Sequence, residues 1–336
     1  MKDLPKVSII IPTYNRANYL PQAIESALSQ DYPNLEVIVS DNCSTDETPE
    51  IVKKYMNDER FRYFRNKENI GMVRNWRKAV FEYSTGDWFL ILSDDDYFID
   101  NKYISKAIGL AKKDEKIVLI YANGYILNEE TKEMQELKLP FSEIEDGKKI
   151  FLSRGKIKPQ DFTLCNVLFN KNIAEKLNPF ANEYNLSCDS ELFLKMCLMG
   201  KVGVIKDLVS VYRVHVSNLI RKISKNYELL IHNIDYVIEP YIIAQNKKLL
   251  NESELDYWFK NLIIKNVIQA IAFCKVYSNN KEGCIKLLEK KIRSKLNIEL
   301  SDIIGSRSLS WKEKLKLQLS EYKYVYRFIS NFRSKK

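Results

Sequence analysis

Apolar and polar positions along the first hundred residues follow two distinct periods. Short β-branched runs, each closed by a polar segment, are typical of buried parallel strands followed by loops. Between these runs, apolar residues recur at helical spacing. The expected strands cover 7–11, 35–40, 60–65 and 88–92, and the expected helices cover 17–30, a stretch through Val52 and Tyr55, and 72–83. Ser44 and Glu47 stand at capping-box spacing before the second helix. This order predicts an α/β fold with a parallel, doubly wound sheet and right-handed crossovers.

The pattern changes near residue 220. Before that point we expect strands at 116–126 and 162–169, a helix at 190–199, a β-rich run at 208–216, and a mobile loop over the charged stretch 128–149. Beyond it, apolar residues at 255–277 and 283–296 predict an antiparallel helical hairpin. The chain is therefore expected to hold an α/β domain over 1–220 and a helical region over 221–336.

Three carboxylates, Asp94, Asp95 and Asp96, directly follow the apolar run 88–92 and Ser93. Adjacent carboxylates repel one another, so this cluster indicates that solvent or a cation neutralises it. In open α/β sheets, ligands bind beyond the carboxyl ends of the strands. The cluster therefore predicts a hard divalent cation that holds a phosphate. An Asp-rich loop that caps the next helix is the alternative.

The usual phosphate-binding signatures are missing from the sequence. No G-x-G-x-x-G follows the first strand, and no G-x-x-x-x-G-K-[ST] occurs. These absences argue against a dinucleotide-dependent dehydrogenase and against a P-loop NTPase. Polar side chains at the strand ends, together with a metal, are left as the means of holding a nucleotide.

Composition and charge add two expectations. The six cysteines are scattered without a C-x-x-C pair, so we expect reduced thiols in a cytoplasmic protein. We find no signal peptide and no apolar run of about 18 residues, so a membrane-spanning segment is not expected.

The net charge of +9 is concentrated in the C-terminal tail. From Ser306 onward, nine Lys and Arg residues stand against two Glu residues and interleave with aromatic residues. Such a tail favours an anionic membrane surface, here the inner face of the cytoplasmic membrane, with packing on the core as the alternative. No nucleic-acid-binding motif accompanies this charge.

Six motifs in order resemble those of family 2 glycosyltransferases of the GT-A fold, over residues 5–220. They are Pro12-Thr13-Tyr14-Asn15-Arg16, Ser40 to Asp46, Asn69-Ile70-Gly71 with Arg74-Asn75, Ser93 to Asp96, Cys188 to Leu192, and Tyr212-Arg213-Val214-His215. The resemblance implies a nucleoside-diphosphate sugar as donor, UDP-linked by comparison with such enzymes, and Mg²⁺ or Mn²⁺ as the metal.

On the donor side, the resemblance implies that Pro12, Thr13, Tyr14 and Asn15 contact the nucleotide, together with Asp41. A carboxylate such as that of Asp41 accepts the imino N–H of uracil; an Asx turn or a helix-capping role is its structural alternative. The resemblance places Arg74 near the diphosphate, where a guanidinium offers a fork of donors. A solvated position on the helix is the alternative for Arg74.

On the metal side, the chain departs from the family's Asp-x-Asp pattern, because Ser93 stands where the first Asp is common. The resemblance implies that Asp95 ligates the metal and that Asp94 contacts the ribose or a metal-bound water. It implies that His215 is a metal ligand or a contact to the departing diphosphate. Mg²⁺ or Mn²⁺ there would stabilise the charge of the leaving group.

Asp189 is the candidate general base, at the expected start of an amphipathic helix. Cys188 stands where the family often has an acid. The implied reaction is one in-line displacement, with inversion, onto a hydroxyl of a cell-surface glycan or a lipid-linked acceptor. Two alternatives stay open: a nucleotidyltransferase, and a non-catalytic scaffold of the same fold. The missing glycine-rich loop after the first strand argues against the former, and the presence of Asp95 and Asp189 against the latter.

Overall fold

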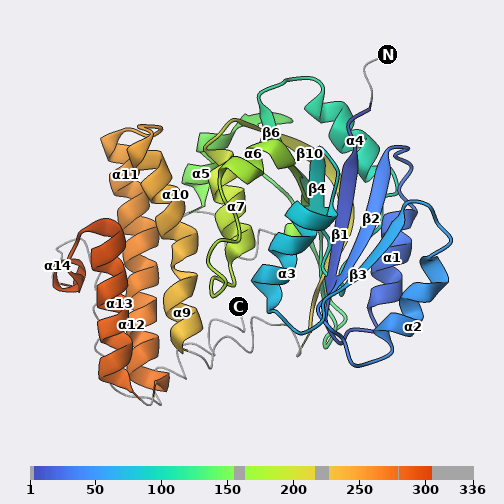
Figure 1. Cartoon of the computed structure of the whole chain (residues 1–336). Helices are drawn as coiled ribbons and strands as arrows, with labels where there is room; N and C mark the ends of the chain where they lie inside the picture. The colour runs from blue at the N-terminus through green and yellow to red at the C-terminus, as the bar shows by residue number, and fades with distance from the viewer. Residues whose placement is uncertain (1–3, 155–162, 216–226, 279, 305–336) are drawn as a thin grey trace. The chain divides into compact units, whose positions relative to one another are not determined.

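The computed structural model describes residues 4–154, 163–215, 227–278 and 280–304 (Figure 1). Their contacts divide them into two compact units. The first unit takes the described residues up to Glu183 and those from Cys188 to His215. The second takes Tyr184–Ser187 and the described residues from Tyr227 onward.

The first unit is built on one mixed sheet whose N-terminal half is parallel, as the sequence predicts. Strands run in the order β3-β2-β1-β4, and every neighbouring pair among these strands is parallel. All seven residues of both β1 and β2 are buried, because these β-branched strands are covered on both faces. The bounds are β1 Val7–Thr13, β2 Leu35–Asp41, β3 Phe61–Arg65 and β4 Trp88–Ile91.

The other half of the sheet mixes parallel and antiparallel pairs. Strand β9 lies antiparallel between β4 and β6, and β6 pairs in parallel with the long strand β10. The short strands β5 and β8 pair antiparallel with β10, and β7 pairs antiparallel with β6. The bounds are β5 Tyr97–Phe98, β6 Ile117–Asn128, β7 Met134–Leu137, β8 Ile144–Asp146, β9 Val167–Asn170 and β10 Lys201–Val214.

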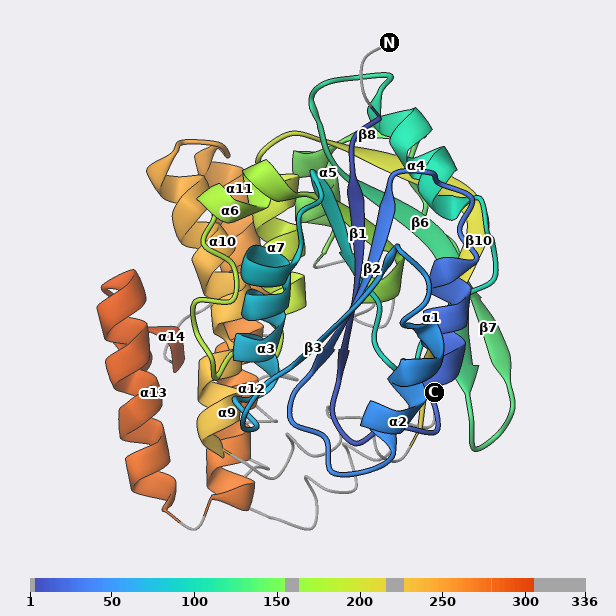
Figure 2. The same cartoon turned by 45° about the vertical axis from the view of Figure 1, so that its right-hand side comes forward.

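Helices cover both faces of the parallel half. In both views α1 and α2 lie on one side of strands β1 to β3 and α3 lies on the other (Figures 1 and 2). Helix α3 continues into a π-helical turn at Ala79–Tyr83, so the expected helix at 72–83 is confirmed. The bounds are α1 Leu20–Leu28, α2 Thr48–Val52, α3 Met72–Lys78, α4 Tyr103–Ala111, α5 Gly147–Ser153, α6 Lys171–Lys176 and α7 Cys188–Cys197.

Three local expectations in this unit are wrong. Helix α2 begins at Thr48 without a capping box, because the Ser44 hydroxyl instead accepts the Asn15 N–H at 3.0 Å. The stretch 128–149 is no simple loop, because β7, β8 and the start of α5 form within it. The strand expected at 162–169 begins only at Val167, after a 3₁₀ turn at Leu164–Asn166.

Helices make up the regular structure of the second unit. A π-helical turn, Phe259–Ile263, joins α11 to α12, so the expected helix at 255–277 is a composite. Helices α12 and α13 form the expected hairpin. The bounds are α9 Tyr227–Asn233, α10 Asp235–Asn246, α11 Glu252–Trp258, α12 Ile264–Tyr277, α13 Lys281–Leu296 and α14 Leu300–Ile304. None of the helices in the described ranges is long and apolar enough to cross a membrane.

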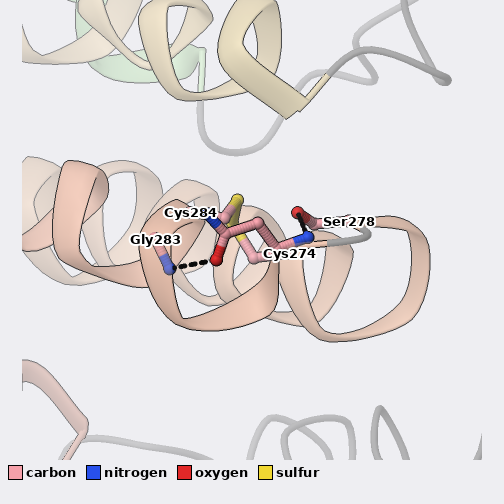
Figure 3. Close-up of a disulfide and its surroundings, with 5 residues drawn as sticks. Cys274, Ser278, Gly283 and Cys284 are labelled. Atoms are coloured by element: carbon pink, nitrogen blue, oxygen red, sulfur yellow. Dashed lines mark hydrogen bonds between the residues drawn. A yellow bond between two sulfur atoms is a disulfide. The ribbon is translucent and has the colours of Figure 1, made fainter.

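The hairpin corrects the expectation that all cysteines are reduced. Cys274 in α12 and Cys284 in α13 form a disulfide (Figure 3). Their spacing of 10 residues gave no C-x-x-C signal, yet the tight turn returns the chain so that their Cα atoms lie 5.7 Å apart. The other four cysteines are free thiols.

A short crossing links the two units. The chain leaves the first unit at Glu183, runs through Tyr184–Ser187 in the second, and returns at Cys188. Within the second unit, the Ser187 N–H donates to Asn233 Oδ1 at 2.8 Å, and the Tyr184 ring lies 5.1 Å from that of His232. The helix that carries Asp189 therefore begins directly after a segment held by the second unit.

Candidate functional site

The three aspartates lie just beyond the carboxyl end of β4, at the edge where β1 and β2 also end. The Leu92 N–H donates to Ile10 O at 2.8 Å and extends the pairing past β4, and the Asp96 N–H closes a turn on Ser93 O. All three side chains are buried, with Asp94 and Asp95 each 8% exposed and Asp96 2%. We refer to Asp94, Asp95 and Asp96 as the acidic edge.

Burial and mutual repulsion disfavour ionisation at the acidic edge. Burial raises the pKa of Asp94 to about 7, the charge of Asp95 adds to this, and the Tyr14 N–H opposes it. The pKa of Asp96 lies well above its usual range, chiefly through burial and the charge of Asp95, although the Arg213 N–H donates to its Oδ1 at 2.9 Å. Bringing positive charge to this edge would relieve the repulsion.

The structure brings His215 to the acidic edge from 120 residues away. His215 is 4% exposed, and its Nε2 lies 2.9 Å from Asp95 Oδ2. His215 follows β10 in the chain. Strand β10 pairs with Tyr97 and Phe98 of β5, and these two residues come directly after Asp96. The pairing of β10 with β5 thus places both side chains at the same end of the sheet.

The donor set of this pair fits a divalent cation that a substrate helps to hold. Within the described parts of the chain, no cluster of three or more His, Cys, Asp or Glu side chains is arranged to enclose a metal. Asp95 and His215 are therefore the residues that would hold the ion.

An aromatic side chain outside the acidic edge packs on the His215 ring. Tyr19 stacks on it, with ring centroids 5.1 Å apart and planes inclined by 20°. Arg213 lies over the rings of Tyr19 and Tyr97, with its Cζ 5.3 Å and 4.8 Å from their centres. Tyr19 falls within the helix expected at 17–30, but it precedes α1 and stacks on His215. The spacing of an aromatic residue does not show whether it lies within a helix or just before it, against a distant side chain.

Asp189 lies in the first turn of α7 and is partly buried. Burial raises the pKa of its carboxyl above the ordinary range, although the Ser190 N–H donates to Oδ1 at 2.7 Å and opposes the shift. Burial also raises the pKa of Tyr212, and the charges of Asp96, Asp95 and Asp189 add to it. Tyr212 thus lies within electrostatic reach of both the acidic edge and Asp189.

The loop after β1 is fastened to the loop after β2. Asn15 adopts the left-handed conformation with φ of 53°, which Asn tolerates better than most residues. Its Oδ1 accepts the Thr45 N–H at 2.7 Å, and the Ala17 N–H donates to Asp46 Oδ2. Thr13 and Pro12 are buried at the end of β1, whereas Tyr14 is 42% exposed. Tyr14 and Asn15 are therefore the expected nucleotide contacts in this loop that have exposed surface.

Asp41 and Arg74 each have protein partners. Asp41 is fully buried; its Oδ1 accepts the Ser44 N–H at 2.8 Å, and its Oδ2 accepts the Tyr63 hydroxyl at 2.7 Å. The first contact spans three residues, whereas an Asx turn spans two. Arg74 lies in α3 with a 60% exposed side chain and forms an ion pair with Glu183. Within the described ranges, Arg74 makes no contact with the acidic edge.

Comparison with known proteins gives a family match over half of the chain. The family model described as glycosyl transferase family 2 matches residues 8–177. A glycosyltransferase of Rickettsia felis, named as uncharacterized, is 30% identical over 230 residues, which are 67% of this chain and 36% of the relative. The putative colanic acid biosynthesis glycosyl transferase WcaA of Escherichia coli is 31% identical over 202 residues, 58% of this chain and 67% of that protein. Across the Rickettsia relatives, the match spans between 32% and 65% of their length.

Two solved structures share the fold at low sequence identity. Staphylococcus aureus TarS 1–349 in complex with UDP has a TM-score of 0.57 at 17% identity, covering 95% of this chain and 91% of that one. The mannosyltransferase PcManGT of Pyrobaculum calidifontis, in complex with GDP-Man and Mn²⁺, has a TM-score of 0.51 at 16% identity, covering 100% and 89%.

Proposed function

Because the chain belongs to glycosyl transferase family 2, we propose that it is an inverting, metal-dependent glycosyltransferase. It moves a sugar from a nucleoside-diphosphate donor, UDP-linked in our proposal, to an acceptor hydroxyl. The fold is the GT-A arrangement that the motifs implied, as the likeness to TarS shows. The observation that carries the proposal is the convergence of Asp95 and His215 at the acidic edge, 2.9 Å apart.

The donor is held at the carboxyl ends of β1, β2 and β4. Asp41, Thr13 and their neighbours Pro12, Tyr14 and Asn15 contact the nucleotide in this proposal, and Asp94 the ribose. Tyr14 offers an exposed ring, and the Asn15–Thr45 contact keeps the loop in place. The UDP complex of TarS supports a uridine nucleotide. Arg74 would need to leave Glu183 before it could reach the diphosphate.

Asp95 and His215 would hold a divalent cation together with the diphosphate of the donor. When bound, Mg²⁺ or Mn²⁺ stabilises negative charge on the departing nucleoside diphosphate. The GDP-Man and Mn²⁺ complex of PcManGT supports this assignment. Burial is the main cause of the raised pKa values of Asp94 and Asp96, and a cation there would offset the repulsion from Asp95 that adds to it.

Asp189 removes the proton from the acceptor. Its raised pKa makes the ionised carboxylate a stronger base than that of a surface aspartate. The acceptor oxygen forms a bond to the anomeric carbon as the bond to the diphosphate breaks. The electron pair of that bond leaves on the diphosphate, the proton passes to Asp189, and the configuration inverts.

The acceptor is a hydroxyl of a cell-surface glycan or of a lipid-linked saccharide. Relatives named for colanic acid biosynthesis and for poly(ribitol-phosphate) glycosylation support a polymeric acceptor. The basic tail from Ser306 onward lies outside the described residues. We propose that it holds the enzyme at the inner face of the cytoplasmic membrane.

Titration calorimetry with UDP, with and without Mn²⁺, tests the donor site. We expect Mn²⁺ to strengthen UDP binding and Asp95→Ala to remove that gain. Asp114→Ala removes a carboxylate that pairs with Lys201 at the surface and is the matched control. If UDP does not bind, the same titration with GDP or dTDP follows, and failure of all three supports a non-catalytic scaffold. Release of pyrophosphate from a sugar phosphate and an NTP would instead support a nucleotidyltransferase.

A further inference from the structure

The His215 ring owes its orientation to a contact that none of the family-like motifs contains. Tyr19, which precedes α1, stacks on the imidazole, with ring centroids 5.1 Å apart. A histidine ring that binds a metal must present one nitrogen in a defined direction. Rotation of the imidazole about its bond to Cβ would turn Nε2 away from Asp95. The stacked ring opposes that rotation.

Tyr19 is itself held in place by two neighbouring strands. Its hydroxyl donates to Glu129 Oε2 at 2.7 Å, directly after β6, and the guanidinium of Arg213 in β10 lies over its ring. Glu129 also forms an ion pair with Arg213 at 3.6 Å. The ring is thus fixed to the strand pair that leads to His215. We call Tyr19, Glu129 and Arg213 the ring clamp.

The ring clamp is also tied to the acidic edge. The backbone N–H of Arg213 donates to Asp96, and the Arg213 guanidinium lies over Tyr97, the next residue along the chain. Arg213 is buried, and its side chain also donates to Gln22 in α1. Arg213 therefore connects the end of β10, which leads to His215, with the segment that bears Asp95. A guanidinium between two rings is well suited to this, because it stacks and donates at the same time.

We propose that Tyr19 is a positioning residue for His215, and that its clamped ring holds the imidazole so that Nε2 stays against Asp95. The proposal rests on the proposed function, because it takes the oriented pair to be the site of a divalent cation. Tyr19 contacts neither the donor nor the cation in this scheme. Its effect is therefore confined to the metal-dependent part of donor binding.

The test compares three variants of the full chain. Tyr19→Leu removes the ring, and Tyr19→Phe keeps the ring but loses the bond to Glu129. Tyr55→Leu is the matched control, because Tyr55 is also partly buried and donates its hydroxyl to a glutamate, Glu25, at 2.9 Å. Each protein is titrated with UDP alone and with UDP in the presence of Mn²⁺.

We expect Tyr19→Leu to weaken the Mn²⁺-dependent gain in UDP affinity by about 10- to 100-fold, the usual effect of losing a residue that orients a ligand. UDP affinity without metal should stay the same. Tyr19→Phe should stay within about threefold of the unmodified protein, because the stacking survives. An unchanged Mn²⁺ gain in Tyr19→Leu overturns the proposal, and so does an equal loss of UDP affinity with and without metal.

Proton NMR of the metal-free protein tests the ring contact independently. The chain has only two histidines, so a His232→Gln variant assigns the His215 ring signals. Stacking predicts cross-relaxation between the ring protons of Tyr19 and His215 and an upfield shift of the His215 signals, which Tyr19→Leu abolishes and Tyr55→Leu does not. Absence of that cross-relaxation overturns the proposal even if Tyr19→Leu fails to fold. If the unmodified protein binds none of UDP, GDP and dTDP, the proposed function fails, and the NMR result alone decides whether Tyr19 orients His215.

Discussion

The carboxyl of Asp189 is partly buried at the start of a helix, and its pKa is raised by that burial. Replacing it by Asn keeps the shape of the side chain but removes the base. We expect Asp189→Asn to bind UDP within about threefold of the unmodified protein and to lose about 10²- to 10⁴-fold in kcat. Calorimetry and a transfer assay measure the two effects. Glu175→Gln, an exposed change on α6, is the control, and joint loss of binding and folding in Asp189→Asn would make the residue structural.

The same raised pKa sets the direction of the pH dependence. A general base works only when ionised, so kcat at saturating donor and metal falls as the pH is lowered through the folded pKa of Asp189. Because that pKa is raised, the fall begins at a higher pH than the ordinary value of about 3.9 would give. A kcat that stays constant down to about pH 4 would contradict the assignment.

At the residue scale, the sequence indicated candidate side chains but not the residues that support them. Asp95 and His215, each a candidate metal ligand on the basis of the resemblance, lie 2.9 Å apart, and in the proposed site a substrate phosphate would complete the metal shell. Tyr19 was missed because its contact with His215 depends on the path of the chain before α1. The disulfide partners Cys274 and Cys284 were missed because spacing alone carries no pairing information.

At the scale of elements, one buried carboxylate ties four segments of the sheet together. Glu36 in β2 accepts from Ser8 in β1 at 2.6 Å and from the Thr85 N–H before β4 at 2.6 Å, and it pairs with Lys6 and Arg62. Burial alone would raise the pKa of Glu36, but these donors outweigh it and lower the pKa to about 2. The network lies at the end of the strands opposite to the acidic edge, so it serves the stability of the sheet.

A lowered carboxyl pKa stabilises the folded state above the unfolded pKa. The contribution of Glu36 is therefore complete above about pH 4.5 and is lost as the pH falls toward about 2. The difference corresponds to about 3 kcal/mol. We expect Glu36→Gln to lower the free energy of unfolding by about that amount near neutral pH, measured by urea unfolding. Glu50→Gln, in an exposed pair with Lys53, should change it by less than about 1 kcal/mol. Equal effects in the two variants would show that the network adds no stability.

The elements also show where local patterns stop being informative. The parallel strands β1, β2 and β4 were predictable because burial on both faces favours apolar, often β-branched residues along most of each strand. The Ser44–Glu47 spacing wrongly predicted a capping box, because the Ser44 hydroxyl accepts the Asn15 N–H instead of capping the helix. The antiparallel insertion of β9 between β4 and β6 depends on long-range pairing, which a periodic pattern does not encode.

At the scale of the whole molecule, the disulfide belongs to the second unit and the acidic edge to the first. Reduction should therefore destabilise the helical unit by about 2–4 kcal/mol and leave UDP affinity unchanged. Alkylation of the denatured protein should label four cysteines without reductant and six with it. The double variant Cys274→Ser, Cys284→Ser is the control, because reductant should not alter its stability. Six labels without reductant would restore the expectation of reduced thiols.

The crossing at Tyr184–Ser187 has a consequence for how such a protein can be altered by recombination. A gene fusion that replaced everything after the first unit at a single junction would keep these four residues from one parent and take their partner, Asn233, from the other. The segment leading into the Asp189 helix would then meet a foreign surface. An exchange of the helical unit between relatives thus needs matched changes at two places in the gene.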